Sequence, residues 1–370
     1  MILQEAYIYK KPKTILTIEN AFRNIKKKYD GLYTKKELKP YLTNKYLKAK
    51  LDKVLSGLAT TILDNLIQEF NFSPKSNITI VYTKIPNMGA YMLSENLARC
   101  KMDKFSSVIH VAKDGRVRFA SNKICNAQIV INTGIIFNPF FTAEMITASL
   151  LHEIGHLFSV PFFKLFYTLE ILDAFCSDVN VGNTEEKYAK LNKFQKKIVS
   201  TYGAFSSFSF IFYSPTEEKE KFADKFASYY GYSEELSKLL GKFYIRSHKG
   251  RYRADTPLDK ALWDLKHIGR DVRPSGYPVT FNRINYLMSV IRNEVNDNKD
   301  ITPRNKKLLN AKIDRINNQL EKLYDTTDDS TLYTLLSNYY FTHKIGKEED
   351  LDNKYFKLFT DYVDYRKNQY

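Results

Sequence analysis

One segment, TAEMITASLLHEIGHLFSV (residues 142–160), constrains this chain more than any other part of its sequence. It contains no proline, and its apolar residues recur at the three- and four-residue spacing of an amphipathic helix. Thr142 stands where an N-cap is expected. Two of the chain's six histidines, His152 and His156, lie four positions apart within it. The segment therefore predicts a helix that presents two imidazoles on one face.

Two imidazoles on one helical face can bind a single metal ion. Zn²⁺ accepts histidine nitrogens at about 2.0–2.1 Å in a tetrahedral arrangement, so His152 and His156 predict a zinc site. Glu153 flanks the same face, where it can accept a proton from a water bound to the metal. The motif His152-Glu153-Ile154-Gly155-His156 (HExxH) therefore predicts metal-assisted hydrolysis.

A second predicted helix can supply the third protein ligand that a catalytic zinc site needs. It lies in SPTEEKEKFADKFASYYGY, residues 214–232. Ser214 and Pro215 are typical of a helix start, and Gly231 is typical of a helix end. Ala223 and Ala227 are small, which would allow this helix to approach the HExxH helix closely.

Two carboxylates of this helix stand four residues apart on one face. We expect Glu220 to be the third metal ligand, and Asp224 to accept the free ring N–H of a zinc-bound histidine. Glu217 and Glu218 are rival ligands, although the first turn of a capped helix already explains acidic residues there.

The pattern resembles a known family of metallopeptidases. HEIGH followed by Glu-x-x-Ala-Asp (220–224) is similar to the gluzincins, and closest to the group of CAAX prenyl proteases and heat-shock-induced membrane zinc proteases. Those families often carry His-Pro, four residues and Arg-Ile; here Tyr277-Pro278-VTFN-Arg283-Ile284 has that spacing, with Tyr replacing His. The resemblance covers about residues 127–290.

The resemblance implies the same roles for the matching residues. His152, His156 and Glu220 match the metal ligands, Glu153 the catalytic base, and Asp224 the acid behind a ligand. The membrane spans of those relatives are absent from this sequence. Glu-x-x-Ala-Asp-x-Phe-Ala also resembles the repressor-cleaving metallopeptidases of mobile elements, whose third ligand usually follows HExxH more closely.

Two further elements of such a site have candidates in the sequence. The oxyanion of a peptidase reaction needs a hydrogen-bond donor; Tyr277 is the first candidate, with His267 and Arg283 behind it. In gluzincin-like folds an edge strand binds the substrate backbone. AQIVINTGIIF (127–137) fits that position, where it would hold an extended peptide.

The order of elements predicts an α+β fold that is mainly helical. We expect a basic helical region over 1–76, a zincin-like domain with a small mixed sheet and the active-site helix over 77–295, and a helical region over 300–370. Strands are predicted in NITIVYTKI (77–85), in AQIVINTGIIF, and in a hairpin around Asp114-Gly115, a turn that needs positive φ.

Composition narrows the class of protein. The hydrophobic fraction of 44% supports a sizeable core and excludes extensive disorder. Three cysteines without a CxxC pair exclude a disulfide framework and fit a reducing compartment. The N-terminus lacks the apolar stretch of a signal peptide. The two most apolar windows, 162–175 and 204–213, are predicted to be buried helix or strand, so we expect a cytoplasmic protein without a membrane span.

The N-terminal region is strongly basic. Residues 1–60 contain 14 Lys or Arg and 5 Asp or Glu, a local net charge of +9 within a chain of net charge +16. This charge fits either a solvated helix surface or a docking arm for nucleic acid or an acidic partner.

Together these features predict a zinc-dependent endopeptidase that acts on polypeptides. The alternative is a structural or docking component of a larger assembly, with a vestigial or purely structural metal site. Both a cellular origin and a viral or mobile-element origin are compatible with the sequence.

Overall fold

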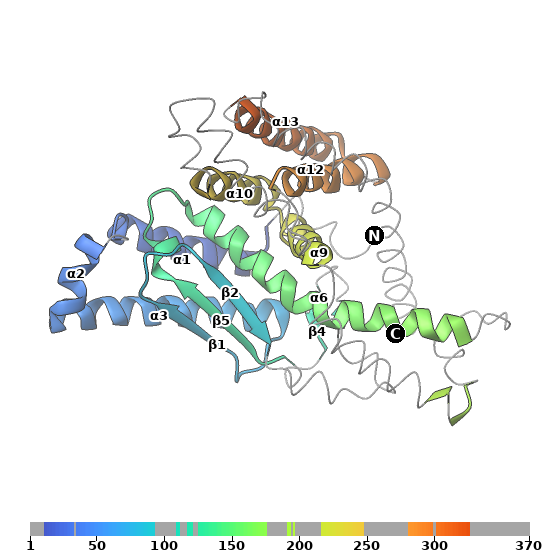
Figure 1. Ribbon diagram of the computed structural model, residues 1–370, viewed down its shortest axis with the longest axis horizontal. Coiled ribbons are helices and arrows are strands. Elements are labelled where there is room, and N and C mark those ends of the chain that lie inside the picture. The colour runs from blue at the N-terminus through green and yellow to red at the C-terminus, as the bar shows by residue number, and fades with distance from the viewer. Residues whose placement is uncertain are drawn as a thin grey trace, which may run out of the picture.

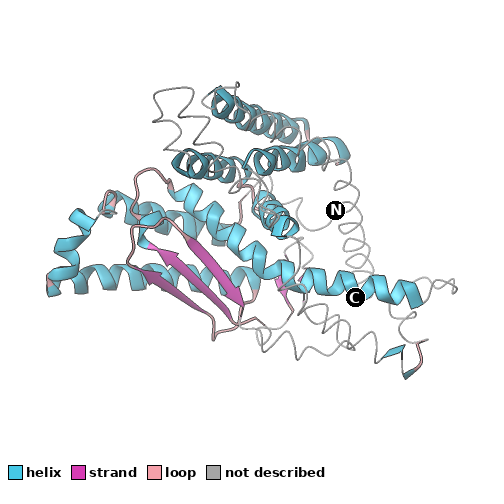
Figure 2. Ribbon diagram, viewed as in Figure 1, coloured by secondary structure: helices cyan, strands magenta, loops and turns pink. Residues whose placement is uncertain are grey.

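A computed structural model describes residues 11–32, 35–92, 109–111, 117–120, 125–175, 191–193, 195–196, 216–247, 280–298 and 301–325. These residues form a mainly helical α+β fold with one small mixed sheet (Figures 1 and 2), as the sequence predicts. The elements are α1 (Lys13–Tyr29), α2 (Lys35–Thr43), α3 (Lys45–Phe70), β1 (Asn77–Val81), β2 (Met88–Met92), β3 (Ile109–Val111), β4 (Val117–Phe119), β5 (Ala127–Asn132), α5 (Thr133–Ile136), α6 (Ala143–Phe175), α9 (Thr216–Tyr229), α10 (Ser233–Ser247), α12 (Thr280–Asp297) and α13 (Pro303–Asp325).

The three-stranded sheet has the order β1-β5-β2. β1 runs parallel to β5, whereas β2 runs antiparallel to it, with Ala90 opposite Ile129. The expectation that AQIVINTGIIF provides the edge strand is therefore wrong, because β5 lies in the centre and β2 forms the edge beside α6. A strand's place in a sheet depends on what pairs with its second side, which its own alternation of apolar residues does not encode.

The predicted hairpin around Asp114 is also present as a strand pair. β3 and β4 pair antiparallel, with Ile109 opposite Phe119 and Val111 opposite Val117, so the pairing is centred on residue 114. The turn itself lies outside the described residues.

Helix α6 carries the HExxH motif. Thr142 caps it, since its hydroxyl accepts a hydrogen bond from the Met145 N–H at 3.3 Å. The apolar stripe predicted for this helix is buried, including Leu151 and Ile154. The helix continues through Pro161 to Phe175, so the apolar window 162–175 is helical. Among the described residues, no helix is both long and apolar enough to cross a membrane.

A single hydrophobic core joins the first and last described helices to the sheet. It contains Phe22 of α1, Leu58 of α3, Ile131 of β5, Leu151 of α6 and Leu320 of α13. In Figure 1, α6 runs between the sheet and the group formed by α9, α10, α12 and α13. The HExxH helix is therefore packed on both sides.

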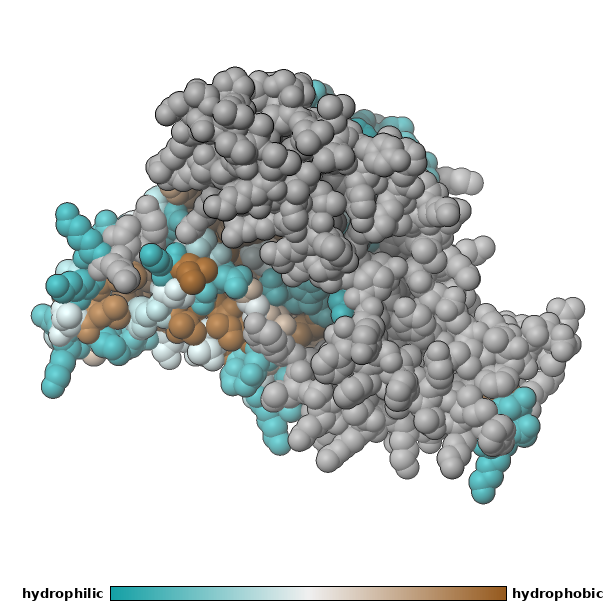
Figure 3. Space-filling view, in the orientation of Figure 1, coloured by the Kyte–Doolittle hydropathy of each residue, from teal (hydrophilic) through white to brown (hydrophobic). Residues whose placement is uncertain are grey.

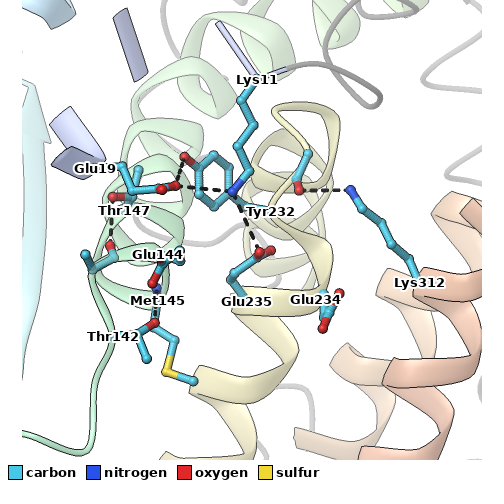
Figure 4. Close-up of polar contacts among 12 residues, drawn as sticks. Lys11, Glu19, Thr142, Glu144, Met145, Thr147, Tyr232, Glu234, Glu235 and Lys312 are labelled. Atoms are coloured by element: carbon cyan, nitrogen blue, oxygen red, sulfur yellow. Dashed lines mark hydrogen bonds and ion pairs between the residues drawn. The ribbon is translucent and has the colours of Figure 1, made fainter. Parts of the chain in front are cut away.

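Polar contacts also hold the turn between α9 and α10 (Figure 4). Gly231 takes a φ of +84°, which ends α9 at the predicted place. The Tyr232 hydroxyl donates to Glu19 of α1 at 2.7 Å, and the Lys11 ammonium lies 3.2 Å from the same carboxylate oxygen. Lys312 of α13 donates to the Gly231 carbonyl at 3.2 Å. Groups from both ends of the described chain thus meet at the turn that follows α9.

Candidate metal centre

Helices α6 and α9 bring His152, His156 and Glu220 together. The two histidine Nε2 atoms lie 3.2 Å apart, and the Glu220 carboxylate lies 3.3 Å from Nε2 of His152 and 3.5 Å from Nε2 of His156. Two ligand atoms at about 2.0–2.1 Å from one tetrahedral ion are separated by about 3.3–3.4 Å. The three side chains therefore form a mostly buried group that could hold a metal ion.

The close approach of the two helices depends on small residues. A Cβ atom built on Gly155, inside the HExxH motif, would lie 2.7 Å from the Ala223 Cα atom and 3.0 Å from the Phe226 Cβ atom. Gly155 and Ala223 thus allow the two backbones to approach closely at the level of the candidate metal ligands. The small size of Ala223 has the consequence expected from the sequence.

Asp224 stands directly behind His152. Its carboxylate is fully buried and lies 2.9 Å from Nδ1 of His152. This contact puts a proton on Nδ1 and leaves Nε2 directed toward His156 and Glu220, which is the orientation that a metal-binding histidine needs. Asp224 therefore lies beside the ring nitrogen where the sequence predicts it, and its role in metal binding stays a prediction.

Arg283 of α12 adds a partly buried positive charge to the site. Its guanidinium donates to Asp224 from Nε at 2.8 Å and from Nη2 at 2.6 Å, and Nη1 lies 3.0 Å from Glu220. The sequence suggested Arg283 only as a third candidate for the oxyanion donor. Arg283 belongs to the Arg-Ile element that resembles the gluzincins, and this element was the sequence feature that could have indicated its position beside Glu220 and Asp224. Tyr277 and His267, the other candidates, lie outside the described residues.

Burial and the surrounding charges shift the pKa values of the two histidines in opposite directions. Burial disfavours the charged form of His152, but Asp224 and Glu220 outweigh it and raise the pKa of His152 to about 9. Burial, together with repulsion from His152, lowers the pKa of His156 to about 4. The pKa of Glu220 falls to about 2 despite burial, because His152 and Arg283 favour its carboxylate. A metal ion bound to Nε2 of His152 would take the place of the proton on that nitrogen, while Nδ1 keeps its proton toward Asp224.

Glu153 lies on the side of the site that faces the sheet. The Ala90 N–H of the edge strand β2 donates to Oε2 of Glu153 at 3.3 Å. Burial raises the pKa of this carboxyl group, and the nearby Glu220 carboxylate raises it further, against the opposing effect of His152. The structure thus places Glu153 between the histidine pair and a strand edge.

The remaining predicted features of α9 are only partly described. The side chains of Glu217 and Glu218, the rival ligands, lie outside the described part of the chain, as do Ser214 and Pro215.

Comparison of the chain with protein-family models, curated proteins and solved structures finds no match. The resemblance to gluzincins therefore rests on the motifs alone.

Proposed function

We propose that this protein is a zinc-dependent endopeptidase of the gluzincin type. The observation that carries the proposal is the convergence of His152, His156 and Glu220 at separations of 3.2 to 3.5 Å. Zn²⁺ suits these donors, because it takes imidazole nitrogens and carboxylate oxygens and in catalytic sites leaves a fourth position open. A zinc ion held there supplies a Lewis acid that acidifies water and polarises a carbonyl.

Glu153 is the residue to which we assign proton transfer. It takes the proton of the attacking water and delivers it to the amine of the departing fragment, so it begins and ends the cycle as a carboxylate. Its burial supports this role, because a carboxyl group with a raised pKa is better matched to a reaction near neutral pH. The hydrogen bond from Ala90 holds the carboxylate in place.

The substrate in this proposal is an extended polypeptide that binds along β2. Ala90 lies opposite Ile129 of β5, yet its N–H is directed to Glu153. Ala90 therefore belongs to a non-hydrogen-bonded pair of the antiparallel ladder, in which the main-chain N–H and C=O groups point away from the partner strand. Pairs of this kind recur at every second residue, so the main-chain groups of Met88 and Met92 also point away from β5. The Ala90 N–H is taken by Glu153, so the main-chain groups of Met88 and Met92 and the Ala90 carbonyl would pair with a peptide backbone and place one of its carbonyls near the metal site.

Replacement of the proposed base tests the catalytic assignment. The Glu153→Gln variant should keep stoichiometric zinc and lose cleavage of a peptide library. The His152→Ala variant should lose the metal as well. Full cleavage by Glu153→Gln would disprove the role of this residue.

The same experiment separates an enzyme from the alternative assignment. If the wild-type protein binds one zinc ion per chain and cleaves no peptide under any condition, the site is structural, and the chain acts as a docking component. If it binds no zinc, the peptidase proposal and a structural metal site both fail, and the alternative that remains is a docking component with a vestigial site.

A further inference from the structure

The corner between α2 and α3 carries a group of exposed lysines that the proposed peptidase activity does not use. We call Lys36, Lys39, Lys45, Lys50 and Lys53, together with Tyr46, the basic corner. All five lysines are exposed, and none forms an ion pair with any residue that the structure describes. The nearby Lys48 differs, since it pairs with Asp52 at 2.9 Å. The basic corner therefore presents a net positive charge.

Helix geometry explains why part of this charge forms a stripe. Leu51 and Leu55 mark the buried face of α3. At 100° per residue, Tyr46, Lys50 and Lys53 lie within about 60° of one another on the opposite face, whereas Lys45 lies to one side. Tyr46, Lys50 and Lys53 extend over about 10 Å along the helix axis. Tyr46 has 74% of its surface exposed, the highest fraction among the exposed large hydrophobic side chains.

The basic corner lies at one end of the molecule. Figure 1 draws α2 at the outer left end, where α3 begins, away from α12 and α13. In the same orientation, Figure 3 shows mainly hydrophilic residues projecting at that end. A long, flexible polyanion could therefore reach the lysines.

We infer that the basic corner binds single-stranded nucleic acid. The lysines would neutralise phosphates and release their counterions, which is the main source of affinity in such complexes. Tyr46 would stack on an unpaired base, as exposed aromatic side chains do in proteins that bind single strands without sequence preference. The function inferred here is independent of the metal centre.

Two other partners fit the composition of the basic corner less well. Protein interfaces have an apolar centre and are depleted in lysine. Binding to a membrane surface scales with the apolar area that inserts, and this corner exposes only Tyr46 and 42% of Leu42. Nucleic-acid interfaces are, by contrast, polar and strongly positive.

Binding of the full-length protein to a labelled single strand of about 20 nucleotides, measured by fluorescence anisotropy over a series of salt concentrations, tests the inference. Each lysine that contacts a phosphate contributes about 0.7 to the slope of log K against log salt. The Lys50→Gln/Lys53→Gln variant should therefore lower the slope by about 1.4 and weaken binding about 25-fold at about 0.1 M salt.

A matched variant controls for net charge. Lys306 and Lys307 are exposed residues of α13, distant from the basic corner in Figure 1. The Lys306→Gln/Lys307→Gln variant changes the net charge equally and should alter binding less than about twofold, because charges beyond about 10 Å are screened. Equal losses in the two double variants would overturn the inference.

Tyr46 provides the second readout. The Tyr46→Ala variant should weaken binding at least about fivefold, whereas Tyr46→Phe keeps a ring that can stack and should bind as the wild type does. If Tyr46→Ala binds normally, or if vesicles containing phosphatidylserine or polyglutamate bind more tightly than the oligonucleotide, the assignment to single-stranded nucleic acid is wrong. Glu153→Gln should bind the oligonucleotide unchanged, so failure of the peptidase proposal leaves this inference testable.

Discussion

Arg283 donates two hydrogen bonds to the carboxylate of Asp224, from Nε at 2.8 Å and from Nη2 at 2.6 Å. The same carboxylate lies 2.9 Å from Nδ1 of His152. A fully buried acid is thus shared between a guanidinium and an imidazole. The positive charge of Arg283 keeps the pKa of Asp224 low despite burial, so the acid stays ionised as an acceptor for the histidine N–H.

The Asp224→Asn substitution should weaken zinc binding by about 10–100-fold, the usual cost of losing an acid that orients a metal-binding histidine. An amide cannot match the charge of the acid, and it leaves Arg283 short of a counter-ion. The affinity can be measured by competition with a zinc chelator, on protein shown by circular dichroism to be folded. Asp64→Asn, at an exposed position of α3, is the control and should bind zinc like the wild type. Equal affinities in the two variants would contradict the role of Asp224.

The Gly155→Ala substitution should force α6 and α9 apart, since the added methyl group would lie 2.7 Å from the Ala223 Cα atom. Overpacking of this kind costs about 1–3 kcal/mol of unfolding free energy, and here it should also lower zinc affinity. Gly57 of α3 is the matched control, because a Cβ atom there meets nothing within 4 Å. Gly57→Ala should leave zinc affinity unchanged and raise stability by up to about 1 kcal/mol. Urea unfolding and zinc titration of both variants check this, and a tolerated Gly155→Ala would mean that the helices can separate without loss.

Sequence spacing was informative where the relevant geometry is local. The four-residue intervals from His152 to His156 and from Glu220 to Asp224 each fix two side chains on one helical face, whatever the rest of the fold does. α3 and α13 likewise lie within the regions 1–76 and 300–370 that the sequence predicts to be helical.

The spacing of residues in the sequence did not predict positions that depend on contacts between distant segments. β5 has the alternation of a strand that is buried on one face, and nothing in it reveals that β2 pairs with its second edge. The position of Arg283 depends on how α12 packs against α9, which the sequence of neither helix determines. The polar contacts of Tyr232 join residues more than two hundred positions apart and leave no local pattern.

The Tyr232→Phe substitution should lower the free energy of unfolding by roughly 1.5–3 kcal/mol, the range for a hydrogen bond to a charged group. Burial raises the pKa of the Tyr232 phenol, so the hydroxyl remains a donor to Glu19 at all ordinary pH values. Since this bond anchors the turn after α9, the variant should also bind zinc more weakly. Tyr46→Phe, at an exposed position, should change neither quantity. Unfolding curves of Tyr232→Phe that overlay those of the wild type would rule out the anchoring role.

The Glu234→Gln substitution should make stability less dependent on pH. Glu234 of α10 accepts hydrogen bonds from Lys238 at 2.7 Å and from Arg315 of α13 at 2.9 Å. Burial opposes its charged form, but these two cations outweigh it and hold the pKa below the usual value of 4.5. A lowered pKa in the folded state means that the ionised group stabilises the protein above that usual value, and that this contribution is lost as the pH falls through the folded-state pKa.

The wild type should therefore melt at a higher temperature than Glu234→Gln at about pH 7, and the difference should close toward about pH 3. Thermal unfolding followed by circular dichroism across this range measures the difference directly. Glu321→Gln, at an exposed position of α13, should follow the wild-type curve at each pH. A gap between wild type and Glu234→Gln that stays constant with pH would show that the cations do not act on the Glu234 carboxylate, and that α10 and α13 are joined by apolar packing instead.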